Sequence, residues 1–102
     1  MAGDGIAVTR NEETSRFELR SGGRVAELVY RQHGNRLVLL HTGVPTELEG
    51  HGFGGRLVTA AVDYAAGHGL AVVPLCPFTR AWLERHPDLA SRTPVEWGTG
   101  AG

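Results

Sequence analysis

The chain has 102 residues, with 10 basic and 11 acidic side chains and a formal net charge of −1 at pH 7. Nucleic acids and anionic membrane surfaces attract proteins with a basic excess, so this balance argues against both as general partners. The length suits one domain with one core, and we expect a monomer or a weak homodimer.

Cysteine usage and apolar runs indicate the compartment. Cys76 is the single cysteine, which excludes an intrachain disulfide and fits a reducing compartment. The first residues contain neither a basic stretch nor an apolar one, and no apolar run is long enough to span a bilayer. We therefore expect a cytoplasmic protein without a signal peptide or membrane segment.

The first half of the chain has the pattern of short strands joined by tight turns. Residues 1–5 and 94–102 are rich in small residues and are expected to be flexible tails, which leaves residues 6–93 as the domain. Strands are predicted at residues 6–10, 16–20, 25–31 and 36–44. The short glycine-containing turns between them predict an antiparallel meander.

After Gly52 the apolar spacing becomes helical, with one stripe that ends near Gly67. The run at residues 70–75 has the length of a strand that is covered on both faces. Pro74 within it predicts a bend or a lost pairing, and a second helix is predicted at residues 78–85.

The order strand, helix, strand predicts two parallel strands joined by a right-handed crossover. We therefore predict an α/β (α+β) fold with a mixed, mostly antiparallel sheet and a central parallel βαβ unit.

The glycine-rich loop at residues 47–57 lies between a strand end and a helix start. Glycines leave backbone N–H groups uncovered, and the helix adds its own unpaired amides and the positive end of its dipole. Together these features predict a phosphate site. A flexible loop with helix-capping glycines is the structural alternative.

Two other phosphate ligands fit the loop poorly. Gly50, Gly52 and Gly55 match the dinucleotide pattern, but no acidic residue ends the next strand to hold a ribose. Gly55 is followed by Arg56-Leu57 rather than by Lys and Ser or Thr, which argues against a nucleoside triphosphate. We expect neither nicotinamide dinucleotide nor ATP chemistry.

Four short runs of residues resemble the small, single-domain members of the GNAT acetyltransferase superfamily. The runs are His41-Thr42-x-Val44-Pro45, Glu49-Gly50-His51-Gly52-Phe53-Gly54, Pro74-Leu75-Cys76-Pro77-Phe78 and Arg85-His86-Pro87. The resemblance covers residues 6–90 and implies a sheet that splays between two central parallel strands, with acetyl-CoA in the splay. The chain lacks the early helices that form the acceptor wall in larger relatives.

The resemblance also implies the residues that contact acetyl-CoA. Backbone N–H groups near Gly43 and Val44 would polarise the thioester carbonyl. The implied cofactor-binding set is Thr42, Gly43, Val44, Gly50, His51, Gly52, Phe53, Gly54, Gly55, Cys76 and Phe78. Glu49 replaces the usual Gln or Arg. Because a carboxylate facing a pyrophosphate is unfavourable, we expect it to point away.

Cys76 and His41 are the candidate catalytic side chains. Cys76 follows the second parallel strand, where it could act as a nucleophile, as an acid for the departing thiolate, or as a small buried hydrophobic residue. Its apolar neighbours suggest a buried thiol with a raised pKa. His41 is expected level with Cys76 and could be the base, or could be hydrogen-bonded within the sheet. The histidines have no metal-ligand spacing with Cys76, so we expect no metal.

Three functions remain open from the sequence. The first is an N-acetyltransferase that moves an acetyl group from acetyl-CoA to a small amine or a lysine, by direct attack in a ternary complex. The second is a non-catalytic module that binds coenzyme A or an acyl-CoA. The third is a protein-interaction domain whose glycine loop is structural.

Overall fold

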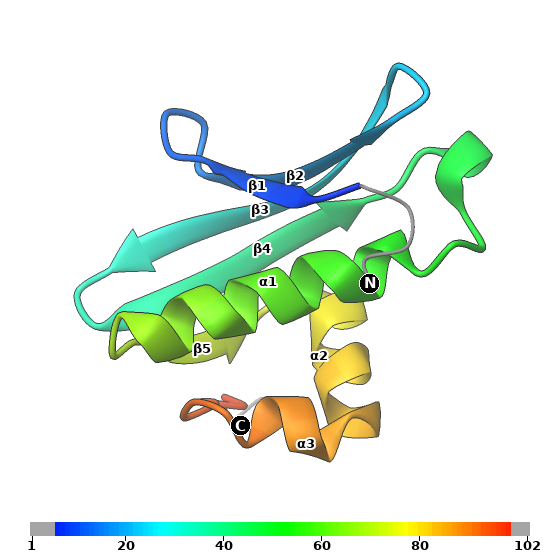
Figure 1. Cartoon of the computed structure of the whole chain (residues 1–102). Helices are drawn as coiled ribbons and strands as arrows, with labels where there is room; N and C mark the ends of the chain where they lie inside the picture. Colours follow the sequence, from blue (N-terminus) through cyan, green and yellow to red (C-terminus); the bar gives the residue numbers. More distant parts are fainter. Residues whose placement is uncertain (1–5, 99–102) are drawn as a thin grey trace.

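A single five-stranded sheet packs its helices against one face (Figure 1). The computed structural model describes residues 6–98. The strand order follows the sequence, β1-β2-β3-β4-β5. The elements are β1 (Val8–Asn11), β2 (Arg16–Ser21), β3 (Arg24–His33), β4 (Arg36–Gly43), the 3-10 helix η1 (Thr46–Leu48), α1 (Phe53–Gly67), β5 (Ala71–Pro74), α2 (Pro77–Arg85) and α3 (Pro87–Ala90).

The antiparallel meander predicted for the first half of the chain is confirmed. Each of the strands β1, β2 and β3 pairs antiparallel with the next one. The turns contain Gly22, Gly23 and Gly34 with φ of 58°, 79° and 59°. Glycine adopts this left-handed conformation at little steric cost, so these residues allow the chain to reverse tightly.

The predicted βαβ unit is also confirmed, because β4 and β5 are parallel and α1 lies between them in the chain. Their register runs from Arg36 opposite Ala71 to Leu39 opposite Pro74. The unit lies at one end of the strand order and not at its centre, since β1, β2 and β3 all lie on the same side of β4.

The two parallel strands part after Leu39. β5 ends at Pro74, and the amides of Leu75 and Cys76 both bond the Leu39 carbonyl at 3.0 Å. β4 continues to Gly43 and pairs there with β3 alone. This parting corresponds to the splay that the family resemblance implies.

A β-bulge changes the direction of the last β4 side chains. The pairing of β3 with β4 shifts by one residue at Leu40. Beyond it, Thr42 and Val44 line a cavity on the side of the sheet that α1 covers. Because successive strand residues point to opposite faces, His41 and Gly43 lie on the other, open face.

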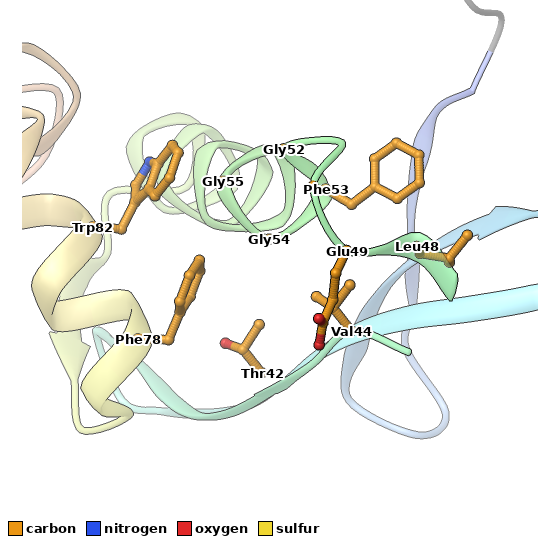
Figure 2. A pocket seen from close by; sticks show the side chains of 11 residues that line it. Thr42, Val44, Leu48, Glu49, Gly52, Phe53, Gly54, Gly55, Phe78 and Trp82 are labelled. Carbon is orange, nitrogen blue, oxygen red and sulfur yellow. The ribbon is translucent and has the colours of Figure 1, made fainter. Parts of the chain in front are cut away.

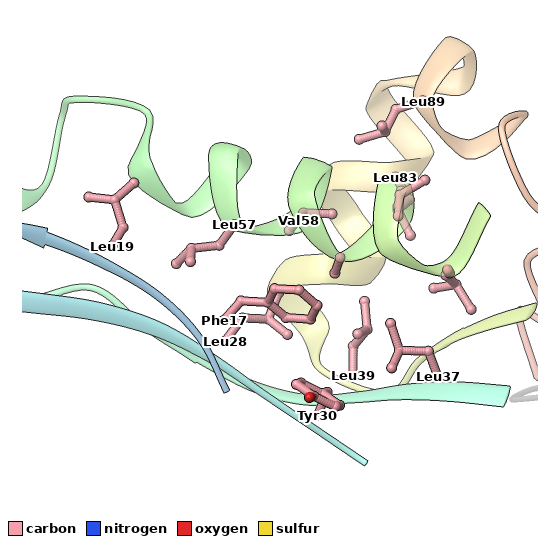
Figure 3. Close-up of a cluster of buried hydrophobic side chains, with 14 of the residues drawn as sticks. Phe17, Leu19, Leu28, Tyr30, Leu37, Leu39, Leu57, Val58, Leu83 and Leu89 are labelled. Carbon is pink, nitrogen blue, oxygen red and sulfur yellow. The ribbon is translucent and has the colours of Figure 1, made fainter. Parts of the chain in front are cut away.

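The core lies between the sheet and α1 (Figure 3). The largest fully buried side chains come from both layers: Leu19, Leu28, Leu37, Leu39, Leu57, Leu83, Val58, Val62, Val72 and Thr79. The α1 members form the apolar stripe that the sequence predicts, and Leu83 of α2 and Leu89 of α3 join the same cluster. No helix in the described part of the chain is both long enough and apolar enough to cross a membrane.

Two glycines at the start of α1 allow α2 to pack closely against it. A Cβ at Gly54 would lie 2.7 Å from the Phe78 ring, and a Cβ at Gly55 would lie 2.1 Å from the Trp82 ring. The two rings stack on each other, with centroids 5.9 Å apart. Part of the glycine cluster is therefore required for helix packing, whatever the loop binds.

The C-terminal tail that the sequence predicts begins as an ordered segment. Val95 forms a parallel bridge with Val72 of β5. The Val72 amide donates to the Pro94 carbonyl and the Glu96 amide donates to the Val72 carbonyl, each at 2.8 Å. This pairing is too short to show a strand pattern in the sequence. The whole predicted N-terminal tail, residues 1–5, and residues 99–102 of the C-terminal one lie outside the described residues.

We expect Gly55→Ala to destabilise the protein by about 1–3 kcal/mol, because the new methyl group would displace the Trp82 ring. Gly67→Ala is the control on the same helix. Its Cβ would meet open space, so the free energy of unfolding should rise by about 0.5 kcal/mol. Urea unfolding followed by circular dichroism measures both. Adding Trp82→Leu to Gly55→Ala should recover part of the loss, whereas a Gly55→Ala variant as stable as wild type would contradict the packing.

Candidate functional site

A cavity of about 450 Å³ opens where α1, α2 and the end of β4 meet, and Figure 2 shows its lining. We call it the main cavity. Its lining residues are Thr42, Val44, Leu48, Glu49, Gly50, Gly52, Phe53, Gly54, Gly55, Phe78 and Trp82. The cavity therefore adjoins the point where the parallel strands part.

The start of α1 contributes backbone amides to the main cavity. Gly52 precedes the helix with φ 76°, and the first hydrogen bond inside the helix runs from the Arg56 amide to the Gly52 carbonyl at 3.1 Å. Helix geometry leaves the amides of residues 53–55 without an acceptor inside the helix. With the positive end of the helix dipole, these amides suit an anion.

Glu49 lines the main cavity. Figure 2 shows its carboxylate beside Val44 and turned away from the start of α1. The nearest arginine in the sequence, Arg56, instead bonds the Ile6 carbonyl, with its guanidinium 5.7 Å from the centroid of the Phe53 ring. Among residues 6–98, the lining of the main cavity holds a carboxylate and no basic side chain, so anion binding by this lining depends on the backbone.

Cys76 lies at the N-terminus of α2, against the end of β4. It is 4% exposed, and its Sγ is 3.5 Å from Thr42 Oγ1. Burial by itself raises the pKa of the thiol, but hydrogen bonds from the Thr42 hydroxyl and from the amides of Thr79 and Phe78 stabilise the thiolate more strongly. The pKa of Cys76 is therefore below its ordinary value, which corrects the raised pKa expected from the sequence.

His41 does not meet Cys76. The bulge at Leu40 places Thr42 against Cys76, and the His41 ring lies on the open face of the sheet. There its Nε2 is 3.4 Å from the position that a Cβ would take at Gly43. The two candidate catalytic side chains thus lie on opposite sides of the β4 end.

The predicted cofactor-binding residues divide between the main cavity and its surroundings. Those that line it are Thr42, Val44, Gly50, Gly52, Phe53, Gly54, Gly55 and Phe78. Gly43 lines a separate cavity on the open face, and Cys76 contacts Thr42. His51 lines a smaller cavity, where its ring stacks on Phe53 with centroids 5.5 Å apart.

Leu48, Glu49 and Trp82 line the main cavity but were not among the predicted binding residues. The signal for Trp82 is its position one helical turn after Phe78, opposite the adjacent glycines of α1. Nothing in the local sequence marks Leu48. Among residues 6–98, the His, Cys, Asp and Glu side chains form no group of three that could hold a metal ion.

Thr42→Val should raise the pKa of Cys76, because it removes the hydroxyl that stabilises the thiolate and keeps the side-chain shape. Thr42→Ser retains a hydroxyl and is the matched control. The pH dependence of iodoacetamide alkylation, followed by intact-protein mass spectrometry, gives the midpoint for this single cysteine. The midpoint should move to higher pH in Thr42→Val alone. A midpoint equal to that of wild type would show that Thr42 does not act on the thiol.

Comparison with known proteins agrees with this geometry. The NMR solution structure of a GCN5-like candidate N-acetyltransferase from Staphylococcus aureus superposes with a TM-score of 0.69 at 26% sequence identity, over 92% of this chain and 94% of that one. The sequence pattern of the GCN5-related N-acetyl-transferase family matches residues 16–92. This chain belongs to the GCN5-related N-acetyltransferase family.

Proposed function

We propose that this protein moves an acetyl group from acetyl-CoA to an amine, with both substrates bound at the same time. The observation that carries the proposal is the main cavity. It joins the unpaired amides at the start of α1 to the end of β4, where the parallel strands part. Family membership supports an acyltransferase role.

The chemistry of the lining supports coenzyme A as the carrier. We assign its pyrophosphate to the amides at the start of α1, which need no basic side chain to bind an anion. We assign the pantetheine chain to the apolar lining at Val44, Leu48 and Phe78. The thioester then belongs at the end of the cavity near Thr42 and Cys76.

When bound, acetyl-CoA supplies an acetyl group already activated as a thioester. We assign polarisation of its carbonyl to the backbone N–H groups of Gly43 and Val44, which lie where β4 continues past the end of β5. His41 accepts a proton from the amine. The C–N bond forms as the C–S bond breaks, and the C–S electron pair leaves with sulfur. Cys76 donates a proton to that sulfur and regains one from solvent.

One observation favours direct attack by the amine over transfer through Cys76. The thiol is 4% exposed and already contacts Thr42, which restricts approach to its sulfur. The lowered pKa of Cys76 suits proton donation to a departing thiolate, but it also increases the thiolate available for nucleophilic attack, so it does not separate the two routes.

The main alternative is a non-catalytic module that binds coenzyme A or an acyl-CoA. Thermal shift with coenzyme A and acetyl-CoA tests binding, and release of free thiol from acetyl-CoA with a panel of amines tests transfer. Binding without thiol release would favour the module. Absence of binding would contradict both the acetyltransferase and the non-catalytic binding module.

Glu49→Gln should tighten coenzyme A binding about fivefold at low salt, because it removes a carboxylate from the lining of the cavity to which we assign the anionic cofactor. The gain should shrink as ionic strength rises. Glu47→Gln is the control, since Glu47 is ion-paired with Arg24 at 3.2 Å and does not line the main cavity. Calorimetric titration measures both affinities. Equal affinities for wild type and Glu49→Gln would contradict the placement of the pyrophosphate in this cavity.

Cys76→Ala should keep coenzyme A affinity and slow transfer by about 10²-fold or more, the typical range for loss of a general acid. A much smaller loss of transfer rate would indicate that Cys76 has only a packing role. The chain contains no lysine, so wild-type protein incubated with acetyl-CoA offers no lysine side chain to acetylate. Intact-protein mass spectrometry should show no stable adduct on Cys76. An adduct that passes to an added amine would establish the covalent route.

A further inference from the structure

We propose that Thr42, supported by Cys76, closes the thioester end of the main cavity and so restricts the transferred group to acetyl. We call these two side chains the cavity floor. The inference rests on the proposed acetyl transfer and names the residues that select the acyl group. Thr42 Oγ1 lies 3.5 Å from Cys76 Sγ. Figure 2 shows this hydroxyl turned toward α2 and the Thr42 methyl group pointing toward α1, into the cavity.

Polar contacts hold the cavity floor in place. Cys76 is 4% exposed, so its side chain has little room to yield. The Thr79 side chain is fully buried, and its hydroxyl donates to the Cys76 carbonyl at 2.9 Å. The Cys76 amide donates to the Leu39 carbonyl at 3.0 Å, which ties the same residue to β4. A larger acyl group could displace the floor only by breaking buried hydrogen bonds, and that loss is unfavourable.

Ring packing fixes the wall beside the floor, which is the side chain of Phe78. The ring lies so close to α1 that a Cβ at Gly54 would be 2.7 Å from it. Phe78 also stacks on Trp82 with centroids 5.9 Å apart, and Trp82 stacks on His86 at 4.1 Å. In closely packed protein, one ring of such a row shifts only if its neighbours shift too. Phe78 therefore has little freedom to turn aside for a longer acyl chain.

The route past the floor, toward the open face of the sheet, is polar. His41 Nε2 lies 3.4 Å, and Glu27 Oε2 lies 3.8 Å, from the position that a Cβ would take at Gly43. The other carboxylate oxygen of Glu27, Oε1, pairs with Arg16 at 3.0 Å. An alkyl tail placed there would cover polar groups without offering them a hydrogen bond, which is unfavourable. The open face therefore gives an apolar acyl tail no alternative place.

These contacts select the acyl group by its size. Acetyl places one methyl group against the cavity floor, and propionyl and butyryl add one and two methylene groups. A single methylene in a closely fitted apolar site changes selectivity by roughly 10- to 200-fold. We therefore expect acetyl-CoA to bind at least about tenfold more tightly than propionyl-CoA, and butyryl-CoA to bind more weakly still.

Calorimetric titration of the wild-type protein tests the size limit without any variant. The titrants are acetyl-CoA, propionyl-CoA and butyryl-CoA, with coenzyme A as the reference. Affinity should fall with each added methylene group, whereas equal affinities for acetyl-CoA and butyryl-CoA would overturn the proposal. Failure of coenzyme A itself to bind would instead overturn the proposed function, so the two failures are distinguishable.

Two substitutions separate the volume of Thr42 from its hydroxyl. Thr42→Ser removes the methyl group, so propionyl-CoA should bind within about twofold of acetyl-CoA. Thr42→Val keeps the volume and loses the hydroxyl, so it should discriminate as strongly as wild type. Thr59→Ser is the matched control, since Thr59 bonds the Gly55 carbonyl at 2.9 Å and does not line the main cavity. If Thr42→Ser discriminates like Thr59→Ser, or if Thr42→Val relaxes the selection, Thr42 is not the floor.

Cys76 provides a second opening of the floor that does not depend on any Thr42 variant. Cys76→Ala removes the sulfur that Thr42 contacts, so the ratio of acetyl-CoA to propionyl-CoA affinity should fall at least about fivefold. Cys76→Ser is the control, because it keeps an atom in that place and should retain most of the discrimination. The same titrations measure both variants, and circular dichroism checks that they are folded. Equal ratios in Cys76→Ala and Cys76→Ser would show that Cys76 does not support the floor.

Discussion

The site depends on where β4 and β5 stop pairing. Pro74 cannot donate a backbone hydrogen bond, and the Leu39 carbonyl accepts the amides of both Leu75 and Cys76. These two hydrogen bonds end the parallel ladder and turn the chain into α2. β4 then runs on for the residues up to Gly43 with one neighbour instead of two.

The starts of two helices lie around this strand end. Gly52 precedes α1 and Cys76 precedes α2, so the unpaired amides of both first turns are available to anionic groups nearby. At the second helix, the amides of Phe78 and Thr79 already stabilise the thiolate of Cys76. The close contact of the two helices, made possible by Gly54 and Gly55, holds both starts in a fixed relation.

The sequence predicted the architecture because its signals are local. Turn glycines such as Gly34 mark the strand ends, and the apolar stripe that contains Leu57 marks α1. The βαβ unit then follows from element order. Most of the main-cavity lining could likewise be predicted, because the glycine loop and the strand end are contiguous segments with recognisable composition.

The features of the site that could not be predicted from the sequence depend on strand register and on contacts between distant segments. The bulge at Leu40 has no signature, yet it decides that Thr42 and not His41 meets Cys76. The direction of the Cys76 pKa shift depends on the hydrogen bond between Thr42 and Cys76. Glu27 is one of several charged residues in β3, a strand of alternating pattern. Its relation to Gly43 appears when β3 and β4 are paired, since Glu27 lies directly opposite Gly43.

The bridge between Val95 and Val72 has a consequence for the behaviour of the folded chain in concentrated solution. β5 is apolar and would otherwise present an open row of hydrogen-bonding groups, the feature through which sheets recruit foreign strands. The Val72 amide donates to the Pro94 carbonyl, and the Val72 carbonyl accepts from the Glu96 amide. The Arg36–Glu96 ion pair holds this segment in place. At the opposite border, β1 is short and carries Arg10. Both edge strands of the sheet are thus protected against edge-to-edge aggregation.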